Sequence, residues 1–309
     1  MKTEKKKYSL IIIGAGPAGL TASIYASRFD IRHLVIGSLI EGRMAEAHLV
    51  GNLPTEGEIK GEELIKKMEN RVKDFGAEIQ LEKASEITRG SNGFLVKTAI
   101  GGEYLTETIL LAMGAGRKKL DVPGGKEFFG KGVSYCVVCD GKFFANKTVA
   151  VIGGSNATAT TADYLSSIAS KVYLIHEEES LRADKVWQEK VKANPKIELV
   201  LGGKIKELKG EDSLKAVILE NGNHEGKELK IDGIFVEMGI IPDLEVVRSL
   251  KLEKDESGFV KIGQDGSTNV QGVWVAGDIT NGSNGFRQII TACSEGVIAI
   301  DSIHSFLNR

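Results

Sequence analysis

Two stretches of the chain share one design, and this design restricts the fold more than any other feature. Each has a short apolar run, a glycine-rich turn and then a helix-forming segment: SLIIIGAGPAGLTASIYASRF at 9–29 and TVAVIGGSNATATTADYL at 148–165. Such a strand, turn and helix are typical of a dinucleotide-binding βαβ unit with a buried parallel sheet. A second apolar strand follows each stretch, HLVIG at 33–37 and KVYLIH at 171–176. The sequence therefore predicts an α/β protein with two Rossmann-like dinucleotide-binding domains.

The order of these segments predicts that one domain is inserted into the other. A chain of 309 residues is too long for one ordinary core. Glycines, charges and a proline at 113–125 indicate a crossing near residue 117, and GIIPDLEVV at 239–247 indicates the return near residue 245. The last section supplies one more buried strand, VWVAGD, and a helix from about Gln288 to Phe306, which is too little to fold alone. We expect residues 1–117 and 246–309 to form the first domain and residues 118–245 the inserted one.

Composition and charge narrow the class of partner. The formal net charge of -2 gives no reason to expect nucleic acid as a partner. The apolar segment at 10–13 is too short for a signal sequence or a membrane span. We therefore expect a cytoplasmic protein with no membrane contact.

The first glycine-rich turn, GAGPAG, has the residue types that a pyrophosphate-binding turn requires. Gly14 permits the tight turn, Gly16 lets the backbone approach the pyrophosphate, and Gly19 allows the helix to pack closely on the strand. The helix N-terminus then offers N–H groups to the phosphates. The usual acid for the ribose at the end of the second strand is absent, because Gly37 stands there and Glu41 is the nearest carboxylate.

Two of the three cysteines lie in YCVVCDG at 135–141. A zinc site would need four ligands, and beyond Cys293 and five scattered histidines nothing repeats a metal-like spacing. Inert core cysteines are a second alternative, since cysteine is a common core residue. Thiol–disulfide exchange needs an attacking thiolate, a resolving thiol and a proton source, which Cys136, Cys139 and Asp140 can supply. We favour this redox interpretation, and we expect Cys293 to pack within a helix.

Four motifs in this order, GAGPAG, CVVCDG, VWVAGDITN and FRQIITACSEG, make the chain resemble the low-molecular-weight thioredoxin reductases over nearly its whole length. The resemblance implies a homodimer in which the first unit binds FAD and the inserted domain binds NADPH and carries the C-x-x-C. It also implies that thioredoxin or a glutaredoxin-like protein is the partner. Cys139 would be the thiol nearest the flavin, Cys136 the thiol that attacks the partner, and Asp140 the acid that manages its proton.

The same resemblance implies a set of FAD-binding residues. Gly277 and Asp278 would contact the ribityl and phosphate region, Arg287 and Gln288 would lie against the isoalloxazine, and Asn52 would touch FAD. The full set is Gly14, Gly16, Pro17, Ala18, Gly19, Gly42, Arg43, Met44, Asn52, Ala112, Gly114, Gly277, Asp278, Arg287, Gln288 and Ile289.

The second glycine-rich turn departs from the family pattern. The family's GGGxSAxEEA is GGSNATATTA here, so that Ser155 replaces a glycine of the turn and Thr158 replaces a small alanine. A side chain at Ser155 obstructs the close approach of backbone to pyrophosphate. Glu237, in VEMG, adds a carboxylate where the family usually has a small residue.

The segment after the next strand departs further. Members that use NADPH have HRRxxxRA, and this chain has HEEESLRA, which leaves Arg182 alone and puts Glu177 and Glu178 where the 2'-phosphate would bind. Glu41 and Arg43 also stand where those members have GGQ. We therefore expect a donor other than NADPH. NADH suits the acids, and a carrier such as ferredoxin or a reduced deazaflavin suits the altered turn, as in divergent branches of the family.

Two other functions stay open at this point. One is the flavoprotein subunit of a peroxide-reducing system, although that relative has an additional N-terminal thioredoxin-like module, and here the first fingerprint begins near residue 10. The other is a non-catalytic, flavin-bound redox sensor. The intact CVVCDG argues against the sensor, because an enzyme that has decayed into a sensor has no need of paired thiols.

Overall fold

The computed structural model describes residues 6–47, 50–91, 93–220 and 225–309. The chain divides into two compact units: unit 1 is Met1–Gly116 with Ile241–Arg309, and unit 2 is Arg117–Ile240. The sequence analysis puts the two crossings near residues 117 and 245. In the structure the crossing segments pair with each other as β7 (Gly116–Arg117) and β16 (Ile240–Ile241), so the return crossing lies before Pro242.

The centre of unit 1 is a sheet with the strand order β3-β2-β1-β6-β5-β4, and β17 also pairs with β6. Strands β1, β2, β3, β6 and β17 are parallel, whereas β4, β5 and β6 form an antiparallel meander. The strands are β1 (Lys6–Ile13), β2 (His33–Ile36), β3 (Glu78–Gln80), β4 (Ala84–Gly90), β5 (Gly93–Thr98), β6 (Glu103–Leu111) and β17 (Val273–Val275).

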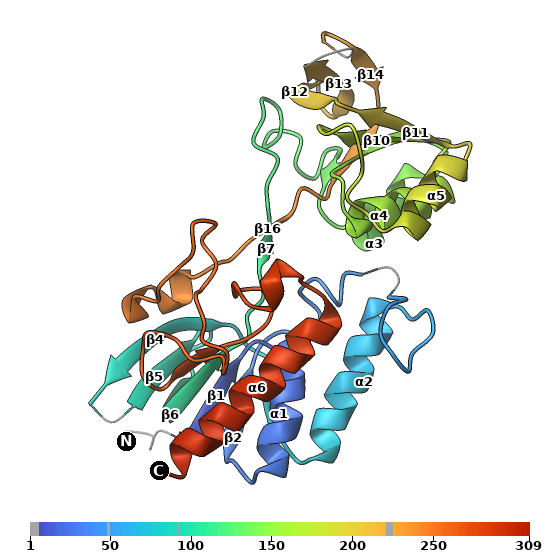
Figure 1. The fold of residues 1–309 in the computed structure, drawn as a ribbon. Coiled ribbons are helices and arrows are strands. Elements are labelled where there is room, and N and C mark those ends of the chain that lie inside the picture. Colours follow the sequence, from blue (N-terminus) through green and yellow to red (C-terminus); the bar gives the residue numbers. More distant parts are fainter. Residues whose placement is uncertain (1–5, 48–49, 92, 221–224) are drawn as a thin grey trace. The chain divides into compact units, whose positions relative to one another are not determined.

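Helices α1 (Pro17–Arg28), α2 (Gly61–Asp74) and α6 (Ile289–Leu307) lie on the same side of this sheet (Figure 1). The apolar run of β1 is buried on both faces: Leu10 and Ile12 pack in the cluster with the helices, while Ile11 and Ile13 pack in the cluster with the meander. This explains why the sequence of β1 is a continuous apolar run and does not alternate between apolar and polar residues. Two 3-10 segments, Glu245–Leu250 and Ser283–Gly285, complete unit 1.

Helix α6 is long and apolar enough to cross a membrane, judged by length and composition alone. One face of the helix packs in the core, where Ala299, Ile300 and Ile303 are fully buried and belong to the same apolar cluster as α1. Gly296 allows the close contact, since a Cβ there would collide with the backbone of Ala18 in α1.

Unit 2 has a parallel sheet with the order β11-β10-β9-β15-β8 and a separate antiparallel sheet, β12-β13-β14. Its helices are α3 (Val137–Asp140), α4 (Asn156–Ser166) and α5 (Lys185–Ala193), with a 3-10 turn at Gly141–Phe144. Its strands are β8 (Val133–Ser134), β9 (Thr148–Ile152), β10 (Lys171–His176), β11 (Ile197–Leu201), β12 (Lys204–Gly210), β13 (Leu214–Glu220), β14 (Glu228–Lys230) and β15 (Gly233–Val236). Both strand–turn–helix segments predicted from the sequence therefore form, as β1–α1 and β9–α4.

Candidate functional site: an open nucleotide turn and a redox disulfide

The glycine turn of unit 1 leaves its helix N-terminus open. Gly16 is the N-cap of α1, and among the described residues no side chain hydrogen-bonds to that N-terminus. A Cβ placed on Gly16, Gly42 or Gly114 would meet no described atom within 4 Å. Gly14 has a φ of 116° and lies against the backbone of Ala112, a close approach that only glycine permits. The turn therefore fits a phosphate group bound from outside the protein.

Residues that the sequence assigns to this site come together from distant parts of the chain. The Arg43 guanidinium lies 2.8 Å from the Asp278 carboxylate. The Asn52 amide donates a 2.9 Å hydrogen bond to the side-chain oxygen of Gln288. These two pairs join the loop after β2 to the segment between β17 and α6.

The loop after β17 is held by a residue that the sequence analysis missed. Glu295 of α6 accepts hydrogen bonds from the Gly277 backbone N–H at 2.8 Å, from the Thr280 hydroxyl at 2.9 Å and from the Ser283 hydroxyl at 2.5 Å. Gly277 in turn abuts Ala18, because a Cβ there would lie 3.1 Å from the Ala18 Cβ. The signal in the sequence was the single acid of TACSEG, in a helix whose other acid is Asp301.

The Arg287 guanidinium forms hydrogen bonds within the same loop. It donates to the carbonyl oxygens of Asp278 and Thr280, at 3.2 and 3.3 Å, and its guanidinium carbon lies 3.7 Å from the centre of the Phe259 ring. Its predicted place against a flavin stays a prediction. The loop contacts indicate a second role, which is to fix the backbone that carries Asp278.

Other predicted residues lie in α1 or pack in or against its apolar cluster. Pro17 is at the first position of α1, where a missing N–H has no cost, and Gly19 packs against the carbonyl of Gly14. Met44 is buried, and Ile289 begins α6.

The end of β2 has no carboxylate for a steric reason. Gly37 follows β2, and a Cβ there would lie only 2.5 Å from the backbone N of Ala15. Any side chain at this position would therefore collide with the first turn. Glu41 is exposed and forms an ion pair with Lys83 at 2.6 Å.

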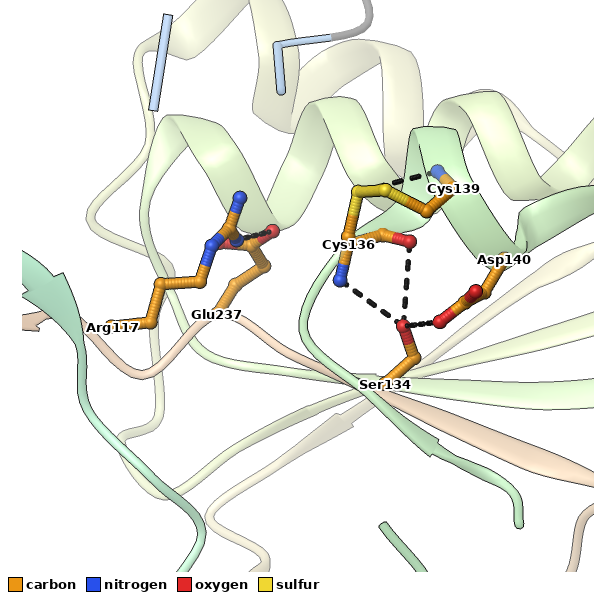
Figure 2. The surroundings of a disulfide bond; sticks show 6 residues. All are labelled: Arg117, Ser134, Cys136, Cys139, Asp140 and Glu237. Atoms are coloured by element: carbon orange, nitrogen blue, oxygen red, sulfur yellow. Dashed lines mark hydrogen bonds and ion pairs between the residues drawn. A yellow bond between two sulfur atoms is a disulfide. The ribbon is translucent and has the colours of Figure 1, made fainter. Parts of the chain in front are cut away.

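The redox cysteines are joined in unit 2. Cys136 and Cys139 form a disulfide with their Cα atoms 5.4 Å apart, directly after β8 (Figure 2). Cys136 is partly buried and Cys139 is exposed. The Cys139 backbone N–H points at the Cys136 Sγ, with the two atoms 3.2 Å apart. This donor would stabilise a thiolate at Cys136, because a hydrogen bond to the charged form of a group favours that form.

Asp140 is connected to the disulfide through Ser134, which the sequence analysis did not single out. The Ser134 hydroxyl donates to the Asp140 carboxylate at 2.6 Å and accepts from the Cys136 backbone N–H at 3.1 Å. Figure 2 shows the hydroxyl between the two groups. The third cysteine, Cys293, packs against the Pro17 carbonyl with its Sγ 3.8 Å away, and burial raises the pKa of its thiol. This agrees with the packing role expected for it.

The second glycine turn differs from the first in how its polar groups are used. Ser155 is the N-cap of α4, at the position that Gly16 has in α1. Its backbone N–H donates to the hydroxyl of the fully buried Thr158 at 3.2 Å. One N–H at this helix end is therefore already bonded to a side chain of the helix, as in a capping box, whereas among the described residues no side chain bonds to the end of α1.

Matching positions at the ends of the second strands also differ. In unit 1 Ile13 pairs with Ile36, and Gly37 is the next residue. In unit 2 Ile152 pairs with Ile175, and His176 is the next residue. His176 therefore stands at the position that Gly37 has in unit 1. The buried His176 ring lies directly over Gly154, and a Cβ on that glycine would run into it.

The acids beyond His176 line the same end of the sheet. Glu178 lies 3.7 Å from the His176 Nε2 and 3.9 Å from the exposed Arg182 guanidinium. The one arginine that remains in HEEESLRA thus faces a carboxylate.

An ion pair lies at the carboxyl end of β15, beside the point where the strand order of unit 2 reverses. Strand order reverses between β9 and β15, and in open α/β sheets the ligand crevice lies outside this reversal point. Glu237 follows β15 directly and accepts a 2.8 Å bond from Arg117 and a 3.4 Å bond from the Thr161 hydroxyl. Figure 2 shows this pair in the surroundings of the disulfide. The side chains of Arg117 and Glu237 are only 21% and 15% exposed, so this ion pair is largely buried.

No group of three or more histidine, cysteine, aspartate or glutamate side chains suited to a metal occurs in the part of the chain that the structure describes. The two features assembled so far are the open glycine turn of unit 1 and the disulfide of unit 2.

Comparisons with known proteins agree with this combination. A family model described as pyridine nucleotide-disulphide oxidoreductase matches residues 8–296. The thioredoxin reductase of Bacillus subtilis is 37% identical, over 99% of this chain and 97% of its own length. The structure of Lactococcus lactis thioredoxin reductase superposes with a TM-score of 0.93 at 32% identity, covering 97% of this chain and 99% of that one.

A ferredoxin-flavin thioredoxin reductase from Clostridium acetobutylicum is also similar, with 26% identity, a TM-score of 0.53 and 99% of both chains covered. FAD is the cofactor of this family, and the open turn of unit 1 fits its pyrophosphate. The chain belongs to the low-molecular-weight thioredoxin reductases, FAD-dependent disulfide oxidoreductases of the pyridine nucleotide-disulphide family.

Proposed function

We propose that this thioredoxin reductase takes its electrons from a donor that is not NADPH and passes them through FAD to the Cys136–Cys139 disulfide. Thioredoxin, or a glutaredoxin-like protein, is the final acceptor. Reduced ferredoxin or a reduced deazaflavin is the favoured class of donor, and NADH is the second. In this proposal the enzyme acts as a homodimer in the cytoplasm.

The Arg117–Glu237 ion pair is the observation that carries the choice of donor. In a dinucleotide-binding sheet the crevice at the reversal of strand order must be free, because the ligand crosses it there. Here two largely buried charged side chains, bonded at 2.8 Å, lie at the end of β15 beside that reversal. A nicotinamide dinucleotide would have to break this pair and bury its partners, which is strongly unfavourable.

Two further observations support the same choice. The N–H of Ser155 is already bonded to Thr158, and the His176 ring covers Gly154, so the backbone of this turn is less accessible than that of unit 1. Glu177 and Glu178, both exposed, would repel the 2'-phosphate that distinguishes NADPH from NADH. This acidic end is also the reason for keeping NADH as the second candidate, since a carboxylate can bind the free ribose hydroxyls.

We propose that FAD is held by the residues that the sequence assigned. The turn from Gly14 to Gly19 would contact the pyrophosphate, and Asp278 would bind the ribityl and phosphate region. The set is Gly14, Gly16, Pro17, Ala18, Gly19, Gly42, Arg43, Met44, Asn52, Ala112, Gly114, Gly277, Asp278, Arg287, Gln288 and Ile289. The pairs Arg43–Asp278 and Asn52–Gln288 support this assignment, since they join its separate segments. FAD supplies the two-electron chemistry, and the protein orients it.

The sulfur chemistry then follows from the roles of three residues. Two electrons break the Cys136–Cys139 bond, and the Cys136 thiolate attacks the partner's disulfide to form a mixed disulfide while one partner sulfur leaves. The Cys139 thiolate next attacks the Cys136 Sγ, which restores the first disulfide and releases the second partner sulfur. Asp140 supplies a proton to a leaving thiolate. The N–H bond from Cys139 to the Cys136 Sγ supports Cys136 as the attacking thiol.

The surface beside the disulfide supports a protein partner. Val138, between the cysteines, is 38% exposed, and Phe143, just after them, is 74% exposed. Exposed apolar side chains next to a reactive disulfide are suited to contact a second protein.

The test is anaerobic bleaching of the flavin in the purified protein, followed at about 450 nm, where flavins absorb. NADPH, NADH, reduced ferredoxin and reduced deazaflavin are offered separately, and oxidised thioredoxin is then added. We expect rapid bleaching by ferredoxin or deazaflavin, followed by formation of thioredoxin thiols.

A matched control separates the donor from the rest of the pathway. The Cys136→Ser/Cys139→Ser double variant should bleach equally fast and reduce no thioredoxin. Rapid bleaching of the unaltered protein by NADPH would overturn our choice of donor, and rapid bleaching by NADH would favour the second candidate.

A further inference from the structure

Ser134 has an unusual number of contacts for a single buried hydroxyl. It ends β8, is 4% exposed, and pairs in register with Phe235 of the neighbouring strand β15. Its oxygen lies 2.6 Å from the Asp140 carboxylate, 3.1 Å from the Cys136 backbone N and 3.3 Å from the Cys136 carbonyl oxygen. Ser134 therefore touches both the proposed acid and the backbone of the proposed attacking cysteine (Figure 2).

A hydroxyl has one hydrogen to donate and two lone pairs to accept, so its arrangement here depends on the charge of Asp140. When the carboxylate is ionised, Ser134 donates to it and accepts from the Cys136 N–H. When the carboxyl is protonated, its own O–H can point at the serine oxygen. The serine hydrogen can then turn to the Cys136 carbonyl oxygen, 3.3 Å away. Both states are satisfied without movement of a heavy atom.

We propose that Ser134 is a positioning residue for proton transfer, which holds the Asp140 carboxyl in one place in both of its protonation states. The backbone supports this, because β8 is anchored in the parallel sheet and the Asp140 N–H bonds to the Cys136 carbonyl at 3.1 Å. Ser134 itself exchanges no proton with the substrate. The inference rests on the proposed function, in which Asp140 protonates a departing thiolate.

The step concerned is the release of the partner. When the Cys136 thiolate attacks the partner's disulfide, a new S–S bond forms and one partner sulfur departs with the electron pair. Asp140 gives that sulfur its proton and becomes a carboxylate, which then accepts a hydrogen bond from the Ser134 hydroxyl. An alkyl thiolate is a poor leaving group and needs this proton, whereas an aromatic thiolate of low pKa departs without it.

The experiment uses this difference between leaving groups. The FAD-loaded enzyme is reduced anaerobically with dithionite and mixed in a stopped-flow instrument with oxidised thioredoxin or with the aromatic disulfide 5,5'-dithiobis(2-nitrobenzoate). The variants are Ser134→Ala, Ser134→Thr, Asp140→Asn and Ser134→Ala/Asp140→Asn. Thermal unfolding of each variant shows that unit 2 is folded.

We expect Ser134→Ala to slow thioredoxin reduction roughly 10- to 100-fold, because a hydrogen bond to a charged group is lost. The rate with the aromatic disulfide should change less than about twofold, since that leaving thiolate needs no proton. Ser134→Thr, which keeps the hydroxyl, should retain most of the activity. In the Asp140→Asn background, Ser134→Ala should add less than about a further twofold loss, because the two residues act as one unit.

Three outcomes would overturn the inference. Equal slowing with both disulfides, or losses that multiply in the double variant, would mean that Ser134 acts on the backbone of Cys136 and not through Asp140. Full activity of Ser134→Ala beside a slow Asp140→Asn would remove Ser134 from the mechanism. If Asp140→Asn itself reduces thioredoxin at the normal rate, the proposed role of Asp140 fails first, and the inference fails with it.

Discussion

Glu295 offers a direct test of how the proposed FAD-binding loop after β17 is held. Its carboxylate receives the Gly277 N–H and the Thr280 hydroxyl on one oxygen and the Ser283 hydroxyl on the other. Gly277 and Thr280 flank Asp278, so the position of Asp278 depends on a side chain seventeen positions further along the chain. We expect Glu295→Ala to destabilise unit 1 and to weaken FAD binding together.

The magnitude follows from the bonds that are lost. A hydrogen bond to a charged group contributes about 1.5–3 kcal/mol, and a buried N–H left without a partner costs about 1–3 kcal/mol. With partial relaxation of the two hydroxyls toward water, Glu295→Ala should lower the free energy of unfolding by about 3–5 kcal/mol. Glu295→Gln keeps one oxygen that can accept from Gly277 and should cost only about 1 kcal/mol.

Urea unfolding followed by tryptophan fluorescence measures this loss within unit 1. Of the two tryptophans, Trp274 lies on β17 and donates to the Ser302 hydroxyl of α6 at 3.0 Å, so its emission reports on the contact between these elements. A Trp187→Phe background removes the signal of unit 2. All samples contain the same excess of free FAD, because bound ligand adds to the apparent stability.

The control is Ser294→Ala, which changes the exposed neighbour on the same helix and should alter the free energy of unfolding by less than about 0.5 kcal/mol. A loss below about 1 kcal/mol for Glu295→Ala would refute the reasoning, because the three bonds would then be replaceable by water. Equal losses for Glu295→Ala and Glu295→Gln would show that the charge, and not the loop contacts, determines stability.

Three further predictions concern unit 1. Arg43→Gln removes the 2.8 Å ion pair with Asp278. Because Arg43 is 41% exposed, we expect the dissociation constant for FAD to rise only roughly 3- to 10-fold in a titration of the apoprotein. Tighter binding of FAD by the variant would contradict this. Gly16→Val fills the open space above the turn and should give colourless protein with an unchanged circular dichroism spectrum. Burial lowers the pKa of His33 below its usual 6.5, so the unfolded chain binds the proton more readily and stability should fall as pH drops through 6.5. The free energy of unfolding should change by no more than about 1.4 kcal/mol per pH unit. In thermal unfolding measured between about pH 5 and 8, His33→Gln should make the stability less dependent on pH.

The parallel strands and their helices were predictable because they carry strong local signals. The run LIII before GAGPAG is buried on both faces of β1, and the following helix begins with Pro17 at its first position. The antiparallel segments gave no such signal. KIKELKG, which forms β12, alternates buried and exposed residues only weakly and is rich in lysine, so its pairing with β13 depends on tertiary contacts.

The site was predictable as a set of residues but not as a set of contacts. Arg43 and Asp278 are separated by 235 positions, and no spacing rule connects them. Glu237 was conspicuous as a departure from the family pattern, but its partner Arg117 could be found only once β15 and the crossing strand had been located. Ser134 was missed for the same reason, since its place between Asp140 and Cys136 depends on how the chain turns after β8.

The two copies of the strand–turn–helix unit show how one local structure can be kept for different reasons. In unit 1 no side chain among the described residues bonds to the helix end at Gly16, so its N–H groups are available to a ligand from outside. In unit 2 Thr158 accepts the N–H of Ser155, and the His176 ring covers Gly154, so part of the backbone of this turn is already occupied by groups of the protein.

If the proposed donor is right, unit 2 no longer needs a dinucleotide, yet its sheet is still required for the disulfide. Strand β8, which leads into Cys136, pairs with β15, and β15 pairs with β9, the strand before the altered turn. Loss of β9 or α4 would therefore remove the support of the disulfide loop even in an enzyme that uses no nicotinamide. This dependence explains why the turn has changed at a few side chains while the strand order around it is that of a complete dinucleotide-binding sheet.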